Sequence, residues 1–476
     1  MKLDKLTHIY FLGIGGIGMS ALARFFRSSG KWVGGYDKTA TALTDELQRE
    51  EIQIHFEESV EKIPVEIKNV SVENALVVWT PAVPVEHKEL EWLKRNGFTI
   101  MKRAQVLGLI VGQTKTIAIA GTHGKSTTTT LTAHILRTAG VDCSAFLGGI
   151  SRNYNTNLLL GKNLGKENVP MKENIVVAEA DEYDRSFLWL HPAIAVVTSV
   201  DADHLDIYGD VEAMKDTYRD FVKQVNDKLI TKEKVVSALG LEKTEKLATY
   251  SVDDKNSDSF ANNIRIEEGY YHFDLVINGK AISNLRMGLP GRHNVENAVA
   301  AVSAAKQIGV DDESVKAALS SFKGVKRRFD FRIRNPKVIF IDDYGHHPAE
   351  LKACISSVKE LFPGKKVTGI FQPHLFSRTR DFADEFARSL ELLDEVILLE
   401  IYPAREKPIP GITSSMLLEK INSKNKFLAS KENLVSEITK HQFDVLLTMG
   451  AGDIDQLVEP LENSLREKYK IQEVNS

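Results

Sequence analysis

Residues 121–126, GTHGKS, combine two glycines with a lysine and a hydroxyl side chain, a combination suited to binding phosphate groups. The apolar run at residues 116–120 predicts a strand before this segment, and apolar residues at helical spacing predict a helix after it. In a loop between such a strand and helix, backbone N–H groups and the helix N-terminus can surround a triphosphate. We expect Lys125 to contact the β- and γ-phosphates and Ser126 to ligate Mg²⁺. The alternative is a glycine-rich turn with an incidental lysine.

Two acidic clusters follow apolar runs further along the chain. Residues 179–182 read EADE and residues 201–204 read DADH. Groups at the carboxyl ends of parallel strands converge on one crevice, so both clusters are expected beside the phosphate loop. Carboxylates and a histidine at that point suit Mg²⁺ near a γ-phosphate. A single cluster of this kind is explained as a solvated loop, whereas two beside a phosphate loop favour metal or phosphate binding.

A second glycine-rich loop lies near the N-terminus. Residues 13–18, GIGGIG, follow the apolar run 8–12 and precede a helical pattern, and Asp37 stands about 20 residues on, as in a dinucleotide-binding unit. Taken alone, this loop predicts a nicotinamide dinucleotide. Because such a loop accepts any pyrophosphate at the helix N-terminus, a pyrophosphate attached to uridine fits as well. The alternative is a tight turn that allows close helix packing.

The C-terminal third carries a third group of polar segments at predicted strand ends. These are residues 326–329 (KRRF), 342–348 (DDYGHHP) and 372–380 (QPHLFSRTR). Arginines can clamp a carboxylate or stabilise a phosphoryl group in transfer, and histidines can orient a small polar substrate. Each segment alone is equally explained as an exposed charge or a capped turn. Together they predict a second substrate site.

The elements that position these segments alternate between strands and amphipathic helices along the whole chain, which predicts an α/β fold with mostly parallel sheets. A chain of 476 residues exceeds one core, and at roughly 150 residues per domain three domains are expected. We place them at residues 1–111, 112–326 and 327–476. Antiparallel strands are expected within residues 270–289, followed by a helix over 294–307.

Composition excludes several classes of protein. The net charge of −4 gives no general attraction for nucleic acid. The two cysteines, Cys143 and Cys354, provide neither a disulfide framework nor a zinc ribbon, which fits a reducing compartment. No stretch approaches the roughly 20 apolar residues of a membrane span, and the apolar N-terminal run is interrupted by glycines, unlike a signal peptide. We expect a cytoplasmic enzyme without membrane insertion; its oligomeric state is left open.

In this order, the motifs resemble those of the Mur ligase family over essentially the whole chain. The family pattern is GxGGxGMS, GTHGK[ST]TT, EADE, DADH, GxHNxxN, RRF, DDYGHHP and QPH. Here it occupies residues 13–20, 121–128, 179–182, 201–204, 291–297, 327–329, 342–348 and 372–374.

The resemblance implies an N-terminal Rossmann-like UDP-sugar domain, a central P-loop ATPase domain and a C-terminal Rossmann-like domain that delivers an amino acid. Its implied partners are ATP, UDP-N-acetylmuramate and L-alanine, with two Mg²⁺ ions as cofactors. ATP phosphorylates the substrate carboxylate, the amine attacks the acyl phosphate, and loss of phosphate leaves an amide for peptidoglycan precursor synthesis. Closure of the C-terminal domain is expected to assemble the site.

Carried over motif by motif, the resemblance assigns residues to four roles. Catalytic roles are implied for Lys125, Glu179, His204, Arg328 and Asp343. ATP binding is implied for Gly121, Thr122, His123, Gly124, Lys125, Ser126, Thr127, Asn294, Asn297, Arg328 and Asp343, and metal binding for Ser126, Glu179 and His204. The UDP-sugar residues are Gly13, Gly15, Gly16, Gly18, Met19, Ser20 and Asp37. The amino-acid residues are Tyr344, His346, His347, His374 and Arg378.

Some positions depart from the family pattern. Ser126 replaces the usual Thr and keeps the hydroxyl ligand, whereas Leu375 and Phe376 stand where Arg and Tyr often follow QPH. Tyr183 replaces a common Ser and resembles the related ligase that recycles a murein tripeptide, although residues 201–206 match the alanine enzymes better.

Three other classes of protein fit the motifs less well. A nicotinamide dehydrogenase leaves Lys125 and Glu179 without a role. Folate polyglutamate ligases need no extra N-terminal glycine-rich domain, and a non-catalytic nucleotide sensor needs no paired substrate sites.

Overall fold

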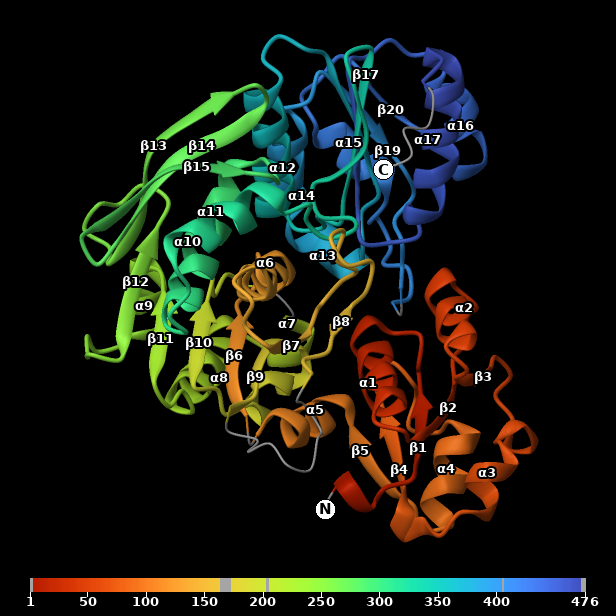
Figure 1. Ribbon diagram of the computed structural model, residues 1–476. Coiled ribbons are helices and arrows are strands. Elements are labelled where there is room, and N and C mark those ends of the chain that lie inside the picture. The colour runs from red at the N-terminus through yellow and green to blue at the C-terminus, as the bar shows by residue number, and fades with distance from the viewer. Residues whose placement is uncertain (1–2, 113, 163–172, 203–204, 405, 472–476) are drawn as a thin grey trace. The chain divides into compact units, whose positions relative to one another are not determined.

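The computed structural model describes residues 3–112, 114–162, 173–202, 205–404 and 406–471. These residues divide into two compact units. Unit 1 contains residues up to 262 together with 275–283 and 297–319, and unit 2 contains 263–274, 284–296 and the residues from 320 onward. Figure 1 shows the three sheets that the chain forms in succession. No helix within the described ranges has the length and apolar character needed to cross a bilayer.

The first sheet of unit 1 is parallel throughout, with the order β3-β2-β1-β4-β5. Its strands are β1 (His8–Leu12), β2 (Trp32–Tyr36), β3 (Gln53–His55), β4 (Ala75–Trp79) and β5 (Thr99–Lys102). Its helices are α1 (Ile17–Ser28), α2 (Ala42–Arg49), α3 (Val65–Asn69), α4 (Lys88–Arg95) and α5 (Arg103–Val111). The strand order reverses between β1 and β4, so their carboxyl ends border a ligand crevice.

The second sheet places the phosphate loop at its centre, because β6 pairs with both β9 and β10. Its order in unit 1 is β12-β11-β10-β6-β9-β7-β8, and only the β7–β8 pair is antiparallel. The strands are β6 (Lys115–Ala120), β7 (Cys143–Phe146), β8 (Leu158–Leu159), β9 (Ile175–Glu179), β10 (Ile194–Val197), β11 (Lys228–Thr231) and β12 (Leu247–Ser251).

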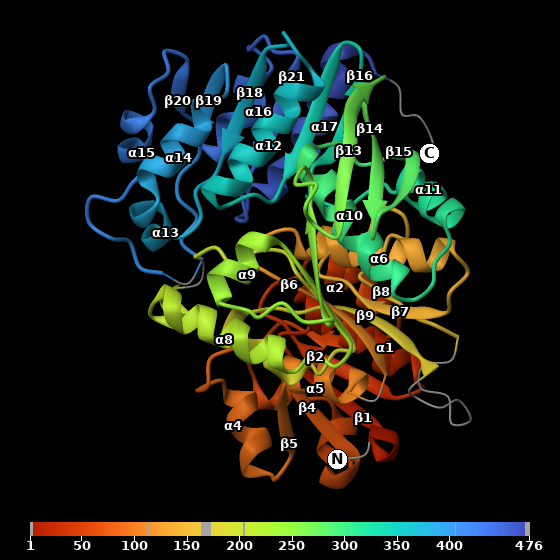
Figure 2. The same ribbon diagram turned by 90° about the vertical axis from the view of Figure 1, so that its left-hand side faces the viewer.

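Helices cover both faces of this sheet, which explains why its strands are apolar on both sides. Strand β6 connects through α6 to β7, toward one edge of the sheet, and β10 connects through α8 to β11, toward the other edge. Because such crossovers are right-handed, the two helices lie on opposite faces of the sheet (Figure 2). The helical segments are α6 (Lys125–Thr138), the 3₁₀ segment η5 (Tyr183–Trp189), α7 (Leu205–Tyr208), α8 (Val211–Lys223) and α9 (Glu233–Leu239).

Three strands continue the second sheet from β12 and precede two helices whose residues are divided between the units. They are β13 (Ser259–Glu267), β14 (Tyr270–Ile277) and β15 (Lys280–Met287), followed by α10 (Arg292–Lys306) and α11 (Asp312–Ser321). The turn between β14 and β15 has positive φ at both Asn278 and Gly279, which is the backbone of a type I′ hairpin.

Unit 2 contains the third sheet, with the order β16-β17-β21-β18-β19-β20. Only β16 is antiparallel to its neighbour. The strands are β16 (Asp330–Asn335), β17 (Val338–Asp343), β18 (Val367–Phe371), β19 (Glu395–Leu398), β20 (Lys426–Leu428) and β21 (Val445–Met449). The helices are α12 (Pro348–Leu361), α13 (Phe376–Asp381), α14 (Ala383–Leu390), α15 (Ser414–Lys420), α16 (Lys431–Ile438) and α17 (Asp455–Tyr469).

The predicted α/β class with mostly parallel sheets is confirmed. The two helices after the glycine loops begin at Ile17 and Lys125, directly at the ends of those loops.

Candidate nucleotide and substrate sites

The phosphate loop connects β6 to α6 through two glycines in the left-handed region. Gly121 has φ +121° and Gly124, the N-cap of α6, has φ +78°. A Cβ atom on Gly124 would lie 2.6 Å from Oδ1 of Asn297, so the loop passes directly against the side of α10 that carries this amide. Of the two asparagines predicted to serve ATP, Asn297 therefore lies beside the loop. Asn294 is buried and donates to the carbonyl of Pro290 at 2.8 Å.

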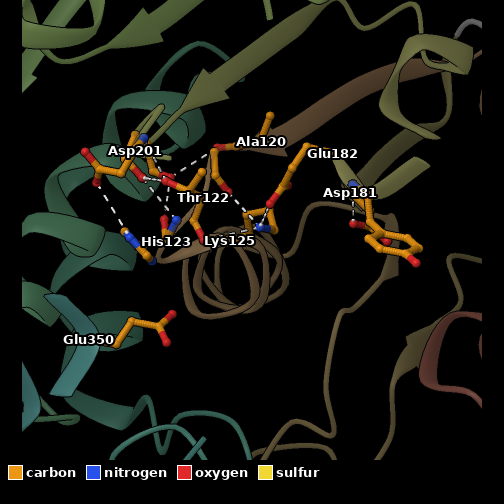
Figure 3. Close-up of polar contacts among 12 residues, drawn as sticks. Ala120, Thr122, His123, Lys125, Asp181, Glu182, Asp201 and Glu350 are labelled. Carbon is orange, nitrogen blue, oxygen red and sulfur yellow. Dashed lines mark hydrogen bonds and ion pairs between the residues drawn. The ribbon is translucent and has the colours of Figure 1, made fainter. Parts of the chain in front are cut away.

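Hydroxyl groups anchor the phosphate loop to the segment that follows β10. The backbone N–H of His123 donates to Oγ of Ser199 at 3.0 Å, and the same Oγ lies 2.7 Å from Oγ1 of Thr122. The backbone N–H of Asp201 donates to Thr122 Oγ1 at 3.2 Å, while its carboxylate lies 3.6 Å from Nε2 of His123 (Figure 3). These bonds hold the loop in one conformation and leave its glycine backbone near the N-terminus of α6.

Lys125 is held by acceptors on two sides. Its ammonium donates to Oε1 of Glu182 at 2.8 Å and to the carbonyl of Gly121 at 2.7 Å (Figure 3). Burial alone would lower the pKa of Lys125, but the charges of Glu182, Glu179 and Asp181 outweigh burial and raise it. The lysine is therefore a cation at neutral pH, as its predicted contact with phosphate groups requires.

Glu179 and Ser126 supply the oxygen atoms of the predicted metal site. Glu179 is the last residue of β9, and its carboxylate lies so close to Gly148 that a Cβ there would collide with it. The hydroxyl of Ser126 sits in the first turn of α6. A carboxylate and a hydroxyl are hard donors that fit Mg²⁺ with phosphate oxygens and water completing the shell. The third predicted ligand, His204, lies outside the described residues, and the remainder contains no group of three acidic, His or Cys side chains that could hold a metal.

The N-terminal glycine loop borders a cavity of about 250 Å³ within unit 1. Its walls include Gly16, Gly18 and Met19 from the loop side and Glu179 from the end of β9. The cavity thus connects the predicted UDP-sugar residues with the predicted metal ligand. Gly13 has φ +87°, which allows the sharp turn out of β1.

Two predicted UDP-sugar residues make bonds inside the protein. Asp37 accepts from the backbone N–H of Gly15 at 2.7 Å and thereby fixes the glycine loop. Ser20 is buried; its hydroxyl donates to the carbonyl of Ile17 and accepts from the Asn157 amide at 2.8 Å. Ser20 thus joins α1 to the segment before β8, and its predicted contact with the sugar nucleotide remains untested.

Unit 2 carries a separate polar cluster at the carboxyl end of β17. The carboxylate of Asp343 is buried and accepts from the backbone N–H groups of Phe329 and Gly345, each at 2.7 Å. Burial raises the pKa of Asp343 to about 6, although the charge of Arg328 and the two N–H bonds act against that rise. Asp343 therefore ties the loop containing Arg328 to the end of β17.

The guanidinium of Arg328 lies over the Tyr344 ring at 4.9 Å from its centroid, and one of its nitrogens lies 3.9 Å from Oε1 of Glu350. The Tyr344 ring also carries Arg327 on its face, at 5.1 Å. Arg327 donates to the Gly450 carbonyl at 2.6 Å, so this arginine belongs to the framework. The cluster presents Arg328, with a 31% exposed side chain, as a cation that can reach an anionic ligand.

The predicted amino-acid residues His346, His374 and Arg378 lie together. The rings of His346 and His374 are 5.9 Å apart, and a guanidinium nitrogen of Arg378 lies 3.4 Å from Nδ1 of His374. His347 has a different environment: it caps α12 by accepting from the backbone N–H of Ala349 at 3.3 Å, and its ring faces Phe382. Its predicted contact with the amino acid remains a prediction.

Several residues at these sites were not among those predicted from the sequence. Arg103 and Gly148 line the cavity, and Tyr402 stacks on His374 with ring centroids 5.7 Å apart. Glu350 accepts from the backbone N–H groups of His346 and His347. A signal existed only for Glu350, because His347 and Glu350 have the spacing of a helix capping box.

A parallel sheet with a phosphate loop at its centre, a charged lysine and two hard oxygen donors define a nucleoside-triphosphate-binding α/β enzyme. Family models match the chain along its length: the Mur ligase family catalytic domain at residues 8–115, the Mur ligase middle domain at 119–305 and the Mur ligase glutamate ligase domain at 327–452. The chain belongs to the Mur ligase family.

Several known proteins are similar to this chain over almost its whole length and almost the whole of their own. The UDP-N-acetylmuramate–L-alanine ligase of Flavobacterium psychrophilum is 50% identical over 98% of this chain and 100% of its own, and that of Cytophaga hutchinsonii is 47% identical over 98% and 99%. The crystal structure of the Thermotoga maritima UDP-N-acetylmuramate–alanine ligase matches with a TM-score of 0.79 at 27% identity, covering 97% of this chain and 99% of that one. A murein peptide ligase from Psychrobacter arcticus shares the fold, with a TM-score of 0.71 at 24% identity over 98% and 100%.

Proposed function

We propose that this chain is an ATP-dependent ligase that joins L-alanine to the carboxylate of UDP-N-acetylmuramate, forming ADP and phosphate, in peptidoglycan precursor synthesis. The observation that carries the proposal is full-length similarity at 47–50% identity to enzymes named for this activity, together with a charged lysine in a phosphate loop. A cytoplasmic location follows from where ATP and the sugar nucleotide are available.

The reaction has two displacements. An oxygen of the muramoyl carboxylate attacks the γ-phosphorus of ATP, and ADP leaves. The uncharged amine of L-alanine then attacks the acyl carbon, and the C–O bond to phosphate breaks as the amide forms and the amine releases its proton. A carboxylate is a poor acyl donor, so phosphorylation supplies the leaving group and the driving force. Ser126 and Glu179 would hold Mg²⁺, which would neutralise charge on the phosphates.

The side chains of the chain serve this sequence by holding charge in fixed places. Lys125 faces the phosphates as a point charge once it leaves Glu182, and the N–H groups at the N-terminus of α6 donate to phosphate oxygens. Arg328 stabilises the charge on the phosphoryl group in transfer. His346, His374 and Arg378 provide donors for the carboxylate of the incoming amino acid. A second ion at His204 completes the proposed metal set.

A second function remains close in chemistry. A ligase that attaches a recycled murein tripeptide to the same sugar nucleotide uses the same ATP chemistry, and residues 179–184, EADEYD, resemble that ligase. Its amine substrate is far larger than alanine. Only the amine substrate distinguishes the two reactions.

The experiment measures phosphate release from ATP with Mg²⁺ and UDP-N-acetylmuramate, with L-alanine, the murein tripeptide or no amine added. We expect release that depends on L-alanine and a product heavier by one alanyl residue. Release with the tripeptide alone would assign the chain to the recycling reaction. No release with either amine would refute the substrate assignment.

A further inference from the structure

Arg103 lies over the N-terminal glycine loop. It is the first residue of α5, and it lines the cavity together with Gly16 and Gly18. A Cβ atom on Gly18 would lie 2.9 Å from both Cδ and Nη1 of Arg103, so any side chain at that position would displace the arginine from its place beside the loop. The guanidinium is thus held beside the N-terminus of α1, where the N–H groups of the first helical turn and the helix dipole favour an anion.

The same guanidinium is already engaged by an acidic residue. Nη2 of Arg103 donates to Oδ2 of Asp181 at 2.9 Å, and these side chains are 21% and 38% exposed. A diphosphate carries more charge and more acceptor oxygens than a single carboxylate, so at the glycine loop it competes effectively for the arginine. The ion pair is partly open to solvent and can therefore exchange partners.

Asp181 belongs to the acidic segment that serves the ATP site. Glu179 lines the same cavity, and Glu182 holds Lys125 at 2.8 Å. The charge of Asp181 is itself one of those that act on Lys125. When Arg103 neutralises Asp181, the segment attracts a divalent cation less strongly. When Arg103 leaves, the full charge of Asp181 adds to that of Glu179.

We propose that Arg103 exchanges Asp181 for the diphosphate of the sugar nucleotide and thereby couples the two sites, so that sugar-nucleotide binding strengthens binding of the magnesium nucleotide. The inference rests on the proposed function for the identity of the sugar nucleotide. The coupling is reciprocal, because each ligand must change the affinity of the other by the same factor. Arg103 is a positioning residue for the ATP site and a direct ligand of the diphosphate.

A neighbouring ion pair provides a matched control. Lys102 precedes Arg103, and its ammonium lies 2.6 Å from Oδ2 of Asp184, so this pair joins the same two segments. Unlike Arg103, Lys102 does not line the cavity. Asp184 has φ +53°, a conformation that asparagine tolerates, and Asp184→Asn therefore removes the ion pair without straining the backbone.

The test is calorimetric binding of UDP and of UDP-N-acetylmuramate to the full-length protein and its variants. Arg103→Ala is expected to weaken both ligands about 10- to 100-fold, the effect of losing a charged hydrogen bond to phosphate. Asp181→Asn is expected to tighten both severalfold, because it removes the competitor and keeps the Oδ1 that accepts from Tyr183 N–H. Asp184→Asn should leave both affinities unchanged. An Asp181→Asn variant that binds UDP as weakly as Arg103→Ala, or an equal effect of Asp184→Asn, would overturn the exchange.

The coupling has its own measurement. Binding of ADP with Mg²⁺ is titrated with and without saturating UDP-N-acetylmuramate. The wild-type protein should bind the magnesium nucleotide severalfold more tightly when the sugar nucleotide is present, and Asp181→Asn should abolish that difference. Equal coupling in both proteins would contradict the proposal. The UDP arm needs neither the muramoyl group nor alanine, so a failed alanine assay would refute the proposed function and leave this inference standing.

Discussion

Several charged side chains of the candidate sites are held inside the protein by groups of opposite charge. Lys125 has a 15% exposed side chain, and its partner Glu182 is 1% exposed. Removing one member of a buried pair leaves the other charge uncompensated. In the ligand-free protein Glu182 therefore stabilises the lysine that is proposed to contact ATP.

This arrangement predicts a ligand-dependent loss of stability in Glu182→Gln. The variant should lose about 3 kcal/mol of unfolding free energy without nucleotide, since Lys125 keeps its charge and loses its nearest carboxylate. In the proposed complex ATP phosphates replace that carboxylate, so a nonhydrolysable ATP analogue should recover part of the loss. Urea unfolding with and without the analogue measures both effects. Glu212→Gln, which alters a solvent-exposed ion pair, is the control and should change neither value; an equal loss in both variants would contradict the argument.

The buried carboxylate of Asp343 predicts a pH-dependent stability. Burial raises its pKa from 3.8 to about 6, so between these values the folded protein binds more protons than the unfolded chain. The contribution of Asp343 to stability is therefore full below pH 4 and is lost as the pH rises through 6. Relative to Asp343→Asn, the wild-type unfolding free energy should fall by about 2–3 kcal/mol between pH 4 and pH 7. Parallel pH profiles for the two proteins would show that the carboxyl has an ordinary pKa.

Arg328 predicts a catalytic effect separate from binding. If it acts on the phosphoryl group in transfer, Arg328→Ala should lower kcat about 100-fold and change ATP affinity much less. Arg332, which pairs with Glu462, provides a control of the same residue type, and Arg332→Ala should leave kcat within a few fold. Equal losses in kcat and in ATP affinity for Arg328→Ala would indicate a simple binding contact.

At the scale of elements, one amide joins the two sheets of unit 1. Asn157 precedes β8, is fully buried, and donates to the Ile17 carbonyl at 2.7 Å and to Ser20 at 2.8 Å. It also accepts from Arg24 at 2.6 Å. The N-terminus of α1, and with it the glycine loop, is therefore positioned by a residue far along the chain.

Asn157→Ala tests this link. The Ile17 carbonyl, the Ser20 hydroxyl and the Arg24 guanidinium each lose one hydrogen-bond partner, and the expected loss of unfolding free energy is about 2–4 kcal/mol. Because α1 is then less well positioned, UDP binding should also weaken, whereas ATP-analogue binding at α6 should stay within about twofold. Thr156→Ala, at the preceding position, is the control. Unchanged stability and UDP affinity in Asn157→Ala would remove Asn157 from this role.

The elements that sequence predicted well are those with local signals. The strand, glycine loop and helix around Lys125 could be placed because apolar runs, glycines and helical spacing all lie within about 25 residues. Arg103 and Asn157 could not, because their roles depend on Asp181 and Ser20, partners distant in sequence. His347 illustrates a different limit: its motif predicted a ligand contact, which stays a prediction, and the structure adds that its side chain caps α12.

At the scale of the whole molecule, the order of motifs carried more information than any single motif. The loop at residues 13–18 alone favoured a nicotinamide dinucleotide, and only its combination with the phosphate loop and the C-terminal segments predicted a ligase. Family models at residues 8–115, 119–305 and 327–452 agree with that combined interpretation. The predicted boundaries at 111 and 326 remain predictions, as do the roles of the individual site residues.

In the proposed reaction, ATP activates the muramoyl carboxylate before L-alanine attacks. UDP-N-acetylmuramate with ¹⁸O in its carboxylate, incubated with ATP, Mg²⁺ and L-alanine, tests that claim atom by atom. Mass spectrometry of the released phosphate should find one ¹⁸O atom per turnover, and the alanyl product should retain the other. Phosphate without the label would mean that the carboxylate never bonded to phosphorus, which would rule out activation through an acyl phosphate.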